Sequence, residues 1–145
     1  MADCDTVPVT LASLESPERL IQSPWQEHAP FAFWLIEQLL PRLVVELGVY
    51  AGYSYCALCQ AVSKYVPGAK AVGIDTWLGD EHSGFFGEAI LADLAAYHDR
   101  RYAGFSALLR SDFDEAVDTF TDGSIDLLHI DGRHFYDDVR RDFAT

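Results

Sequence analysis

Short apolar runs alternate with longer segments of helical periodicity along most of this chain. Runs with the length of buried strands occupy residues 43–47, 70–75, 105–110 and 125–131. Apolar residues spaced as on one face of a helix predict helices over 25–40, 53–66 and 87–100, a short helix between 111 and 120, and a last helix from about 134. Because strands and helices alternate, we expect right-handed crossovers and a parallel sheet in an α/β fold.

The two ends of the chain differ from this pattern. Residues 1–24 hold three of the six prolines and little periodicity, which predicts an irregular lead-in with one helical turn. Residues 25–145 form the predicted domain. Its last helix is still running at Thr145, so we expect a longer protein with an attached C-terminal segment, or a homo-oligomer that covers the edge of the fourth strand.

Composition narrows the range of partners. Half of the 145 residues are apolar, which is typical of a globular domain. Ten Lys and Arg against 23 Asp and Glu give a net charge of −13, which argues against nucleic acid and anionic membranes as partners. No apolar run approaches the roughly 18 residues of a membrane span, and the acidic start lacks a signal-peptide pattern. Three cysteines, an odd number, favour a reducing compartment, so we expect a cytoplasmic protein.

Cys56 and Cys59 form a C-x-x-C motif inside a helical pattern. A zinc site would need a second ligand pair, and a redox motif would normally open its helix. We therefore interpret both cysteines as small buried residues of the helix.

Candidate chemistry gathers where the predicted strands end. In open α/β sheets, ligands bind outside the carboxyl ends of the strands, where the strand order reverses. Acidic residues stand at or just after all four of these ends: Glu46, Asp75, Asp112 and Asp131. A sheet without a ligand would not need that arrangement, so we expect a binding site at this edge.

The first strand runs into the segment Glu46-Leu-Gly48-Val-Tyr50-Ala-Gly52-Tyr-Ser54. Its glycines allow a tight turn and close approach of the backbone to a ligand, although a ligand-free turn would look similar. A dinucleotide fingerprint would carry glycine where Tyr50 stands, and this side chain would obstruct a pyrophosphate. An NAD-dependent oxidoreductase is therefore a weak rival. The segment also lacks the Gly-Lys-Ser/Thr of a phosphate-binding loop.

The same E-x-G-x-x-x-G-x-S segment resembles the first motif of class I S-adenosylmethionine-dependent methyltransferases. Residues 125–143, I-D-L-L-H-I-D-G-R-H-F-Y-D-D-V-R-R-D-F, are very similar to a segment of one branch of that family, and residues 72–82 resemble its second-strand segment. That branch includes glycosyltransferase-associated enzymes and sugar O-methyltransferases of antibiotic pathways. The resemblance implies a Rossmann-like class I methyltransferase, a three-layer sandwich with a parallel sheet, present here mainly as its N-terminal cofactor-binding part.

The resemblance also implies which residues hold the cofactor. Asp75 can accept the ribose hydroxyls of a nucleoside, and Thr76 and Trp77 offer a surface for adenine. Asp75 could instead cap a helix or solvate a loop, and Asp112 could stabilise a helix dipole. Positions after the third strand often contact adenine in this superfamily. The cofactor-binding candidates are Glu46, Gly48, Gly52, Ser54, Asp75, Thr76, Trp77, Ser111 and Asp112.

In some members of the branch, the Asp of the D-G-x-H motif binds a divalent metal and the His acts as a base. Carried over, Asp131 is a Mg²⁺ ligand and His134 the general base, with Asp80 or Glu81 as a second metal ligand. A metal would hold a sugar diol and lower the pKa of its hydroxyl. Alternatively, Asp131 caps the last helix and His134 lies on its surface.

Other polar residues nearby have plainer interpretations. His129, inside the fourth strand, is expected to be a hydrogen-bonded core histidine. We interpret charged positions of the last helix as its solvated face: Asp137, Asp138, Arg140 and Arg141.

The function implied is S-adenosylmethionine-dependent methylation, expected at an oxygen of a sugar or other small hydroxylated acceptor. A non-catalytic binding module on the same fold is the alternative from another class, because fold alone does not prove chemistry.

Overall fold

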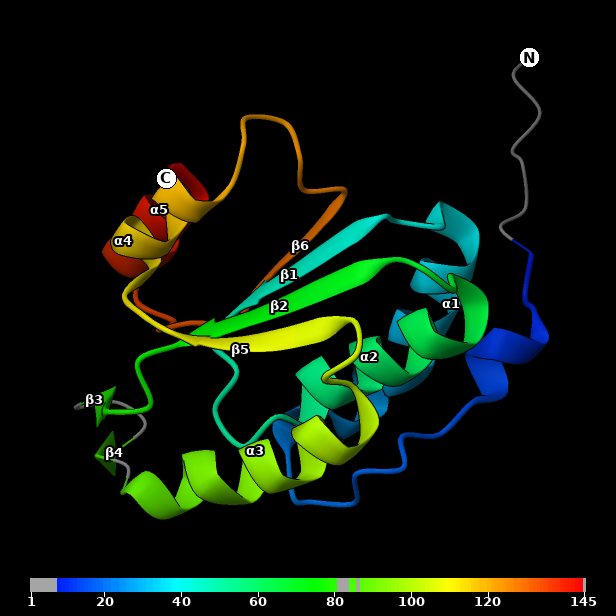
Figure 1. The fold of residues 1–145 in the computed structure, drawn as a ribbon, viewed down its shortest axis with the longest axis horizontal. Coiled ribbons are helices and arrows are strands. Elements are labelled where there is room, and N and C mark those ends of the chain that lie inside the picture. The colour runs from blue at the N-terminus through cyan, green and yellow to red at the C-terminus, as the bar shows by residue number, and fades with distance from the viewer. Residues whose placement is uncertain (1–7, 81–83, 86, 145) are drawn as a thin grey trace.

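A parallel sheet of four strands forms the centre of the molecule (Figure 1). The structure is a computed structural model that describes residues 8–80, 84–85 and 87–144. The strands are β1 (Leu43–Leu47), β2 (Lys70–Asp75), β5 (Ser106–Arg110) and β6 (Leu127–Ile130), in the order β5-β2-β1-β6. All three neighbouring pairs are parallel, which confirms the fold class expected from the alternation of strands and helices.

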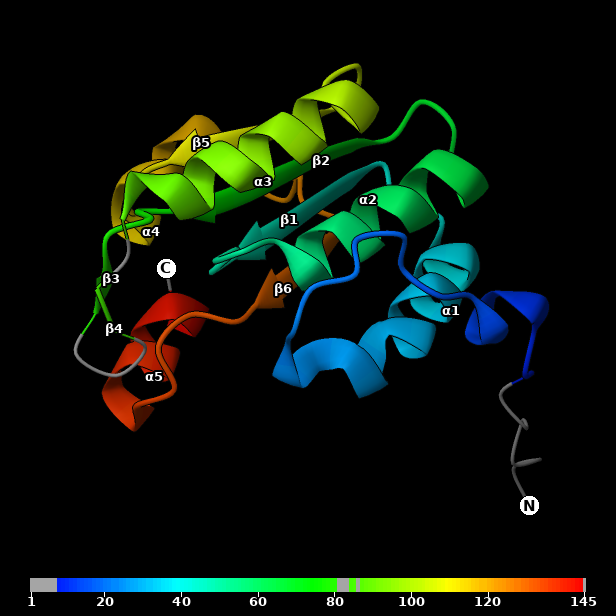
Figure 2. The ribbon, with the colours of Figure 1, turned by 90° about the horizontal axis from the view of Figure 1, so that it is seen from below.

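Helices lie on both sides of this sheet. One side carries α1 (Ala29–Leu39), α2 (Tyr53–Tyr65) and α3 (Glu88–Arg101), which stand in front of the strands in Figure 2. The other side carries α4 (Phe113–Ala116) and α5 (Tyr136–Ala144) near the strands' carboxyl ends (Figure 1). Short 3₁₀ turns complete the fold: η1 (Leu11–Leu14), η2 (Pro24–His28) and η3 (Val117–Thr119). Two short antiparallel strands of two residues each, β3 (Gly79–Asp80) and β4 (Gly84–Phe85), were not expected from the sequence.

Element boundaries follow the predicted ones closely, with local exceptions that have physical causes. The predicted 25–40 helix opens as the separate turn η2, with Pro24 at its first position and Ser23 Oγ accepting from the N–H of Trp25. The fourth strand is shorter than predicted. Asp126 leaves the strand because its carboxylate accepts the backbone N–H groups of Arg42 (2.8 Å) and Leu43 (3.0 Å).

Two apolar clusters hold the layers together. Val44, Phe33 and Tyr55 belong to the larger cluster, between the sheet and α1–α3, and Val45 and Ile74 to the smaller one. Adjacent Val44 and Val45 point to opposite faces, as the two-residue period of a strand requires. Within the described residues, no helix is long and apolar enough to cross a membrane.

The strand order has one reversal, and it falls at β1. The chain moves outward from β1 through β2 to β5, then returns to place β6 on the free side of β1. Since all four strands are parallel, their carboxyl ends meet at one edge of the sheet. This reversal is where open α/β sheets bind ligands.

Candidate functional site

A cleft of about 880 Å³ opens at the carboxyl edge of the sheet. This volume lies in the range of ligand pockets, roughly 300–1,000 Å³. Residues that follow all four strands contribute to its walls, as the distribution of acidic residues predicted. Of the candidate residues named from the sequence, those that line the cleft are Gly48, Gly52, Ser54, Asp75, Thr76, Asp112, Asp131 and His134.

The glycine loop, residues 48–52, forms the floor between β1 and α2. Gly48 has φ +89°, and a Cβ there would overlap the carbonyl oxygen of Asp131 and lie 2.8 Å from the nitrogen of Gly132. Gly52 has φ +81°, and a Cβ there would overlap Leu94 of α3. Both glycines are therefore required by left-handed backbone and by close packing.

Asp75, at the end of β2, holds the glycine loop in place through hydrogen bonds. Its Oδ2 accepts the backbone N–H of Tyr50 and its Oδ1 that of Trp77, both at 2.8 Å. The indole Nε1–H of Trp77 donates to the carbonyl oxygen of Tyr50, also at 2.8 Å. Tyr50 and Trp77 have φ near +50°, a conformation that non-glycine residues adopt only when their surroundings hold them there. Each carboxylate oxygen keeps further acceptor capacity, and Asp75 lines the cleft.

Three cofactor candidates lie outside the residues that line the cleft. Trp77 is 2% exposed, and its indole is hydrogen-bonded to the turn from within. Ser111 donates its backbone N–H to the carbonyl of Asp75 and its hydroxyl to that of Asp112. Glu46 is fully buried beneath the loop. Cofactor contacts by these three residues stay predictions from the resemblance.

Glu46 instead joins β1 to α2 and β6. It accepts hydrogen bonds from Ser54 Oγ at 2.7 Å and from His129 Nδ1 at 2.9 Å. Burial raises the pKa of the Glu46 carboxyl. Burial by itself would lower the pKa of His129, but the hydrogen bond and charge of Glu46, with the charge of Asp131, raise it overall. His129 is thus a hydrogen-bonded strand histidine, as interpreted from the sequence.

Asp131 and His134 come together at the end of β6. Their Oδ1 and Nε2 atoms are 3.1 Å apart, and the imidazole is the more exposed partner. A carboxylate so placed orients the imidazole, and both side chains line the cleft.

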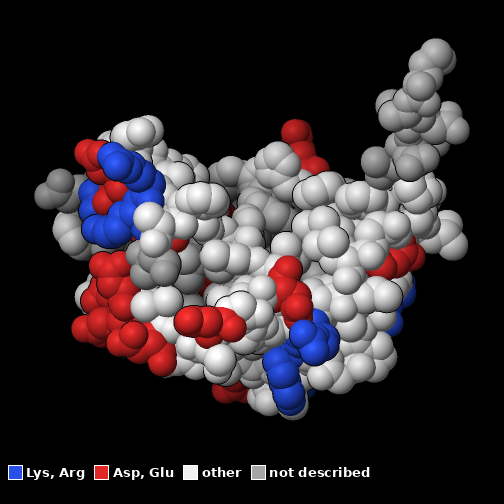
Figure 3. Space-filling model, turned by 90° about the horizontal axis from the view of Figure 1, so that it is seen from above, with Lys and Arg blue, Asp and Glu red and all other residues white. Residues whose placement is uncertain are grey.

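The start of α5 contributes more than the sequence suggested. Asp138 and Arg141 both line the cleft. The side chain of Asp138 is mostly covered, at 16% exposure, unlike the solvated position expected for it, whereas Arg141 is exposed as expected. Arg133 Nε lies 3.3 Å from Asp138 Oδ2, and Arg141 pairs with the same carboxylate at 3.6 Å. Figure 3 shows basic and acidic side chains gathered at the end of the molecule where α4 and α5 lie. Helix α5 is the first element after β6, and this position after a strand end could have indicated that its residues reach the cleft.

The metal assignment rests on residues that the structure covers only in part. Asp131 lines the cleft, the side chain of Asp80 is not described, and Glu81 lies outside the described residues. Among the residues that are described, no group of three or more His, Cys, Asp or Glu side chains could hold a metal ion. Asp131 and His134 therefore do not make a metal site by themselves, and Mg²⁺ stays a prediction.

Sequence reasoning missed one wall of the cleft altogether. Residues 21–24, which the sequence pattern placed in the irregular lead-in, line the cleft. Their only sequence signal is the Ser23-Pro24 helix start.

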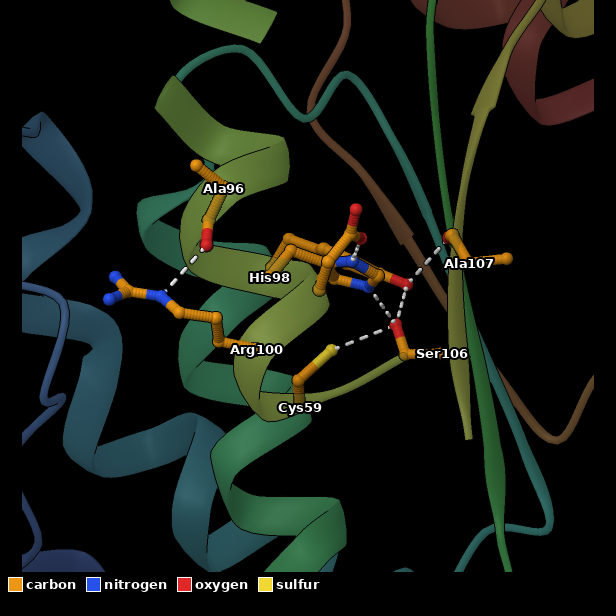
Figure 4. Close-up of polar contacts among 8 residues, drawn as sticks. Cys59, Ala96, His98, Arg100, Ser106 and Ala107 are labelled. Carbon is orange, nitrogen blue, oxygen red and sulfur yellow. Dashed lines mark hydrogen bonds and ion pairs between the residues drawn. The ribbon is translucent and has the colours of Figure 1, made fainter. Parts of the chain in front are cut away.

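A separate polar cluster lies between α2, α3 and β5 (Figure 4). Ser106 Oγ lies 2.8 Å from His98 Nε2 and 2.6 Å from the hydroxyl of Tyr55, and His98 Nδ1 lies 2.9 Å from Asp99 Oδ1. The order Ser-His-Asp is that of a nucleophile triad, but Ser106 and His98 are buried and neither lines the cleft. Cys59 and Cys56 are buried nearby, which supports their interpretation as helix-packing residues. The cluster therefore joins three elements of the core.

Comparison with known proteins agrees with this geometry. A family model described as a methyltransferase domain matches residues 45–145. A curated Sinorhizobium fredii protein, described as uncharacterized protein y4gI, is 50% identical over 123 residues, which are 85% of this chain and 13% of that protein. Since the family model covers well over half of the chain, the chain belongs to the methyltransferase-domain family.

Solved structures share the fold at low sequence identity. The O-methyltransferase TomG from Streptomyces achromogenes, in complex with S-adenosylmethionine, matches with TM-score 0.62 and 18% identity, over 88% of this chain and 51% of TomG. An O-methyltransferase from Bacillus cereus, in complex with S-adenosylhomocysteine, matches with TM-score 0.56 and 16% identity, over 87% of this chain and 56% of that enzyme. The chain thus spans about half of these enzymes and a small part of its curated relative.

Proposed function

We propose that this chain carries the cofactor-binding part of an S-adenosylmethionine-dependent O-methyltransferase acting on a small hydroxylated acceptor such as a sugar. The observation that carries the proposal is the position of Asp75. Its carboxylate faces the cleft at the strand-order reversal, beside the glycine loop that it locks. The family assignment and the ligands named for the two solved O-methyltransferases support the choice of cofactor.

The residues of the cleft fit such a ligand in size and chemistry. Asp75 has acceptor capacity for the ribose hydroxyls, and the glycine loop lets backbone groups approach closely. Tyr50 stands where a dinucleotide site would need glycine, and it lines the cleft, which disfavours NAD. When bound, S-adenosylmethionine would supply an electrophilic methyl group on a sulfonium.

His134 has the role of general base in this proposal. Its imidazole takes the proton of the acceptor hydroxyl as the new oxygen–carbon bond forms, and Asp131 stabilises the resulting imidazolium at 3.1 Å. S-adenosylmethionine, when bound, would keep the electron pair of the carbon–sulfur bond on sulfur, and the acceptor would leave as a methyl ether. Positioning of the hydroxyl by the cleft contributes the remainder of the catalysis. A Mg²⁺ ion held by Asp131 with Asp80 or Glu81 would lower the pKa of the acceptor hydroxyl, as the sequence resemblance implies.

Calorimetric titration with S-adenosylhomocysteine, with NAD in parallel, tests the cofactor. Asp75→Ala should weaken binding by about tenfold or more, because hydrogen bonds to charged groups are strong and the loop loses its lock. Asp126→Ala is the matched control, since its carboxylate also accepts two backbone N–H groups but lies away from the cleft. Binding of NAD alone, or equal binding by both variants, would contradict the proposal.

Turnover is tested separately, with labelled S-adenosylmethionine and a panel of monosaccharides, with Mg²⁺ or a chelator. His134→Gln should retain S-adenosylhomocysteine binding and lose methyl transfer. Binding without transfer to any acceptor would favour the non-catalytic module.

A further inference from the structure

The strap, residues 15–24, crosses the outer side of α2 and ends at the cleft. In Figure 2 it runs across α2 before turning into η2. The methyltransferase-domain match begins only at residue 45, so the strap lies outside the part that defines the family. It has no helix or strand of its own before Pro24, and its position is therefore set by side-chain contacts.

Polar contacts fasten the first half of the strap to α2 and α3. The backbone N–H of Glu18 donates to Gln60 Oε1 at 2.8 Å, and Gln60 Nε2 donates to the carbonyl of Ser16 at 3.2 Å. The carboxylates of Glu15 and Glu18 pair with Lys64 and Arg101. These pairs are largely exposed, and exposed ion pairs contribute little, so they guide the strap rather than fix it.

Arg19 is the only Lys or Arg in the strap, and its side chain is buried, at 6% exposure. Its Nε donates to the carbonyl of Ala51 in the glycine loop at 3.0 Å, and its Nη2 donates to Asp93 Oδ2 of α3 at 2.7 Å. The guanidinium also lies 4.9 Å from the ring centroid of Tyr97. A buried guanidinium is retained only where its donors are satisfied, and these donors join the strap, the loop and α3.

The second half of the strap forms a wall of the cleft. Residues 21–24 line it beside the glycine loop, two to five positions after Arg19. Gln26 Nε2 donates to the carbonyl of Ile21 at 3.2 Å and holds the turn into η2. The same guanidinium that contacts the glycine loop thus stands only two to five positions before the residues of this wall.

We infer that the strap is part of the ligand site and that Arg19 is its positioning residue. Arg19 holds the wall formed by residues 21–24 against the glycine loop, and so sets the affinity for the ligand seated on that loop. The choice of ligand rests on the proposed function, whereas the placement of loop and wall by Arg19 does not.

Two measurements on the folded chain test this inference. The first is the dissociation constant for S-adenosylhomocysteine in Arg19→Gln, Arg19→Lys and Asp93→Asn. The second is hydrogen exchange of the amides in residues 48–54 without ligand. Arg101→Gln is the matched control, because Arg101 also pairs with the strap and lies 4.8 Å from the Tyr97 ring but has no bond to the loop.

Arg19→Gln should weaken binding by about tenfold and speed exchange in the loop, while Arg101→Gln changes neither. Arg19→Lys should fall between them, since one ammonium can reach Ala51 or Asp93 but lacks the guanidinium fork. If Arg19→Gln does not fold, the affinity and loop exchange of Arg19→Lys and Asp93→Asn are compared with those of Arg101→Gln instead. Unchanged affinity and exchange with a lowered melting temperature would overturn the inference. If the wild-type chain does not bind S-adenosylhomocysteine, the proposed function fails, and loop exchange alone decides the role of Arg19.

Discussion

The Cα of Gly48 faces the main-chain carbonyl of Asp131 so closely that no side chain fits between them. The contact joins the end of β1 to the end of β6, and it places the glycine loop beside the Asp131–His134 pair. The glycine loop and the strand end that carries Asp131 and His134 therefore share one backbone contact.

Gly48→Ala should be strongly destabilising, by about 3 kcal/mol or more, because both overlap and positive φ oppose a methyl group. Gly68→Ala is the control, since Gly68 has φ +96° but nothing within 4 Å of a Cβ. That variant should lose only about 1 kcal/mol, the cost of left-handed backbone. Urea unfolding measures both, and equal losses would show that the Asp131 contact is unimportant.

Ser106→Ala should destabilise the core by about 1–3 kcal/mol, because His98 Nε2 is then buried without its hydroxyl partner. Ser124→Ala is the comparison, since the Ser124 hydroxyl is buried and has no hydrogen-bond partner among the residues that the structure describes. Its removal should change stability by less than about 0.5 kcal/mol or improve it. Denaturation midpoints that shift equally would contradict the role given to the Ser106 cluster.

The Glu46–His129 pair predicts a dependence of stability on pH. The pKa of His129 is raised above 6.5 in the folded protein, so its contribution is fully present below pH 6.5 and is lost as pH rises through the folded value. Unfolding free energies measured upward from pH 6 should therefore decline. His129→Gln does not titrate, and its curve should lack this decline. A wild-type curve that rises over the same interval would refute the pairing.

Buried thiols should resist modification. Burial raises the pKa of Cys56 to about 12 and raises that of Cys59 as well. Thiolate is the reactive form, so in a Cys4→Ser background both thiols should react with an aromatic disulfide reagent only at the rate of unfolding. Rapid reaction of either thiol in native buffer would mean that α2 is not packed as described.

Periodicity and turn chemistry were sufficient to predict the sheet and most helices, because each strand is a short apolar run bounded by glycine, proline or acidic residues. The glycine loop, Asp75, Asp131 and His134 could be placed together because parallel strands end at one edge. The burial of Trp77 was not predicted. Its burial depends on a left-handed backbone at a non-glycine residue, which the sequence pattern does not reveal.

The strap was missed for a different reason. Its position depends on single long-range bonds, such as Arg19 to Ala51 and to Asp93, and such bonds leave no periodic trace in the sequence. Asp138 and Arg141 were missed because a charged pair one turn apart on a helix is usually solvated.

The cleft draws its walls from residues as far apart as Ile21 and Asp142. Few of those walls exist until chain segments remote in sequence have docked, so a ligand has almost no affinity for partly folded forms. By mass action, a ligand at 100 times its dissociation constant should stabilise the native state by about 2.7 kcal/mol. Occupancy of the cleft therefore reports whether these segments have folded together, and a thermal-shift screen can reveal ligands of the cleft before any assay of activity exists.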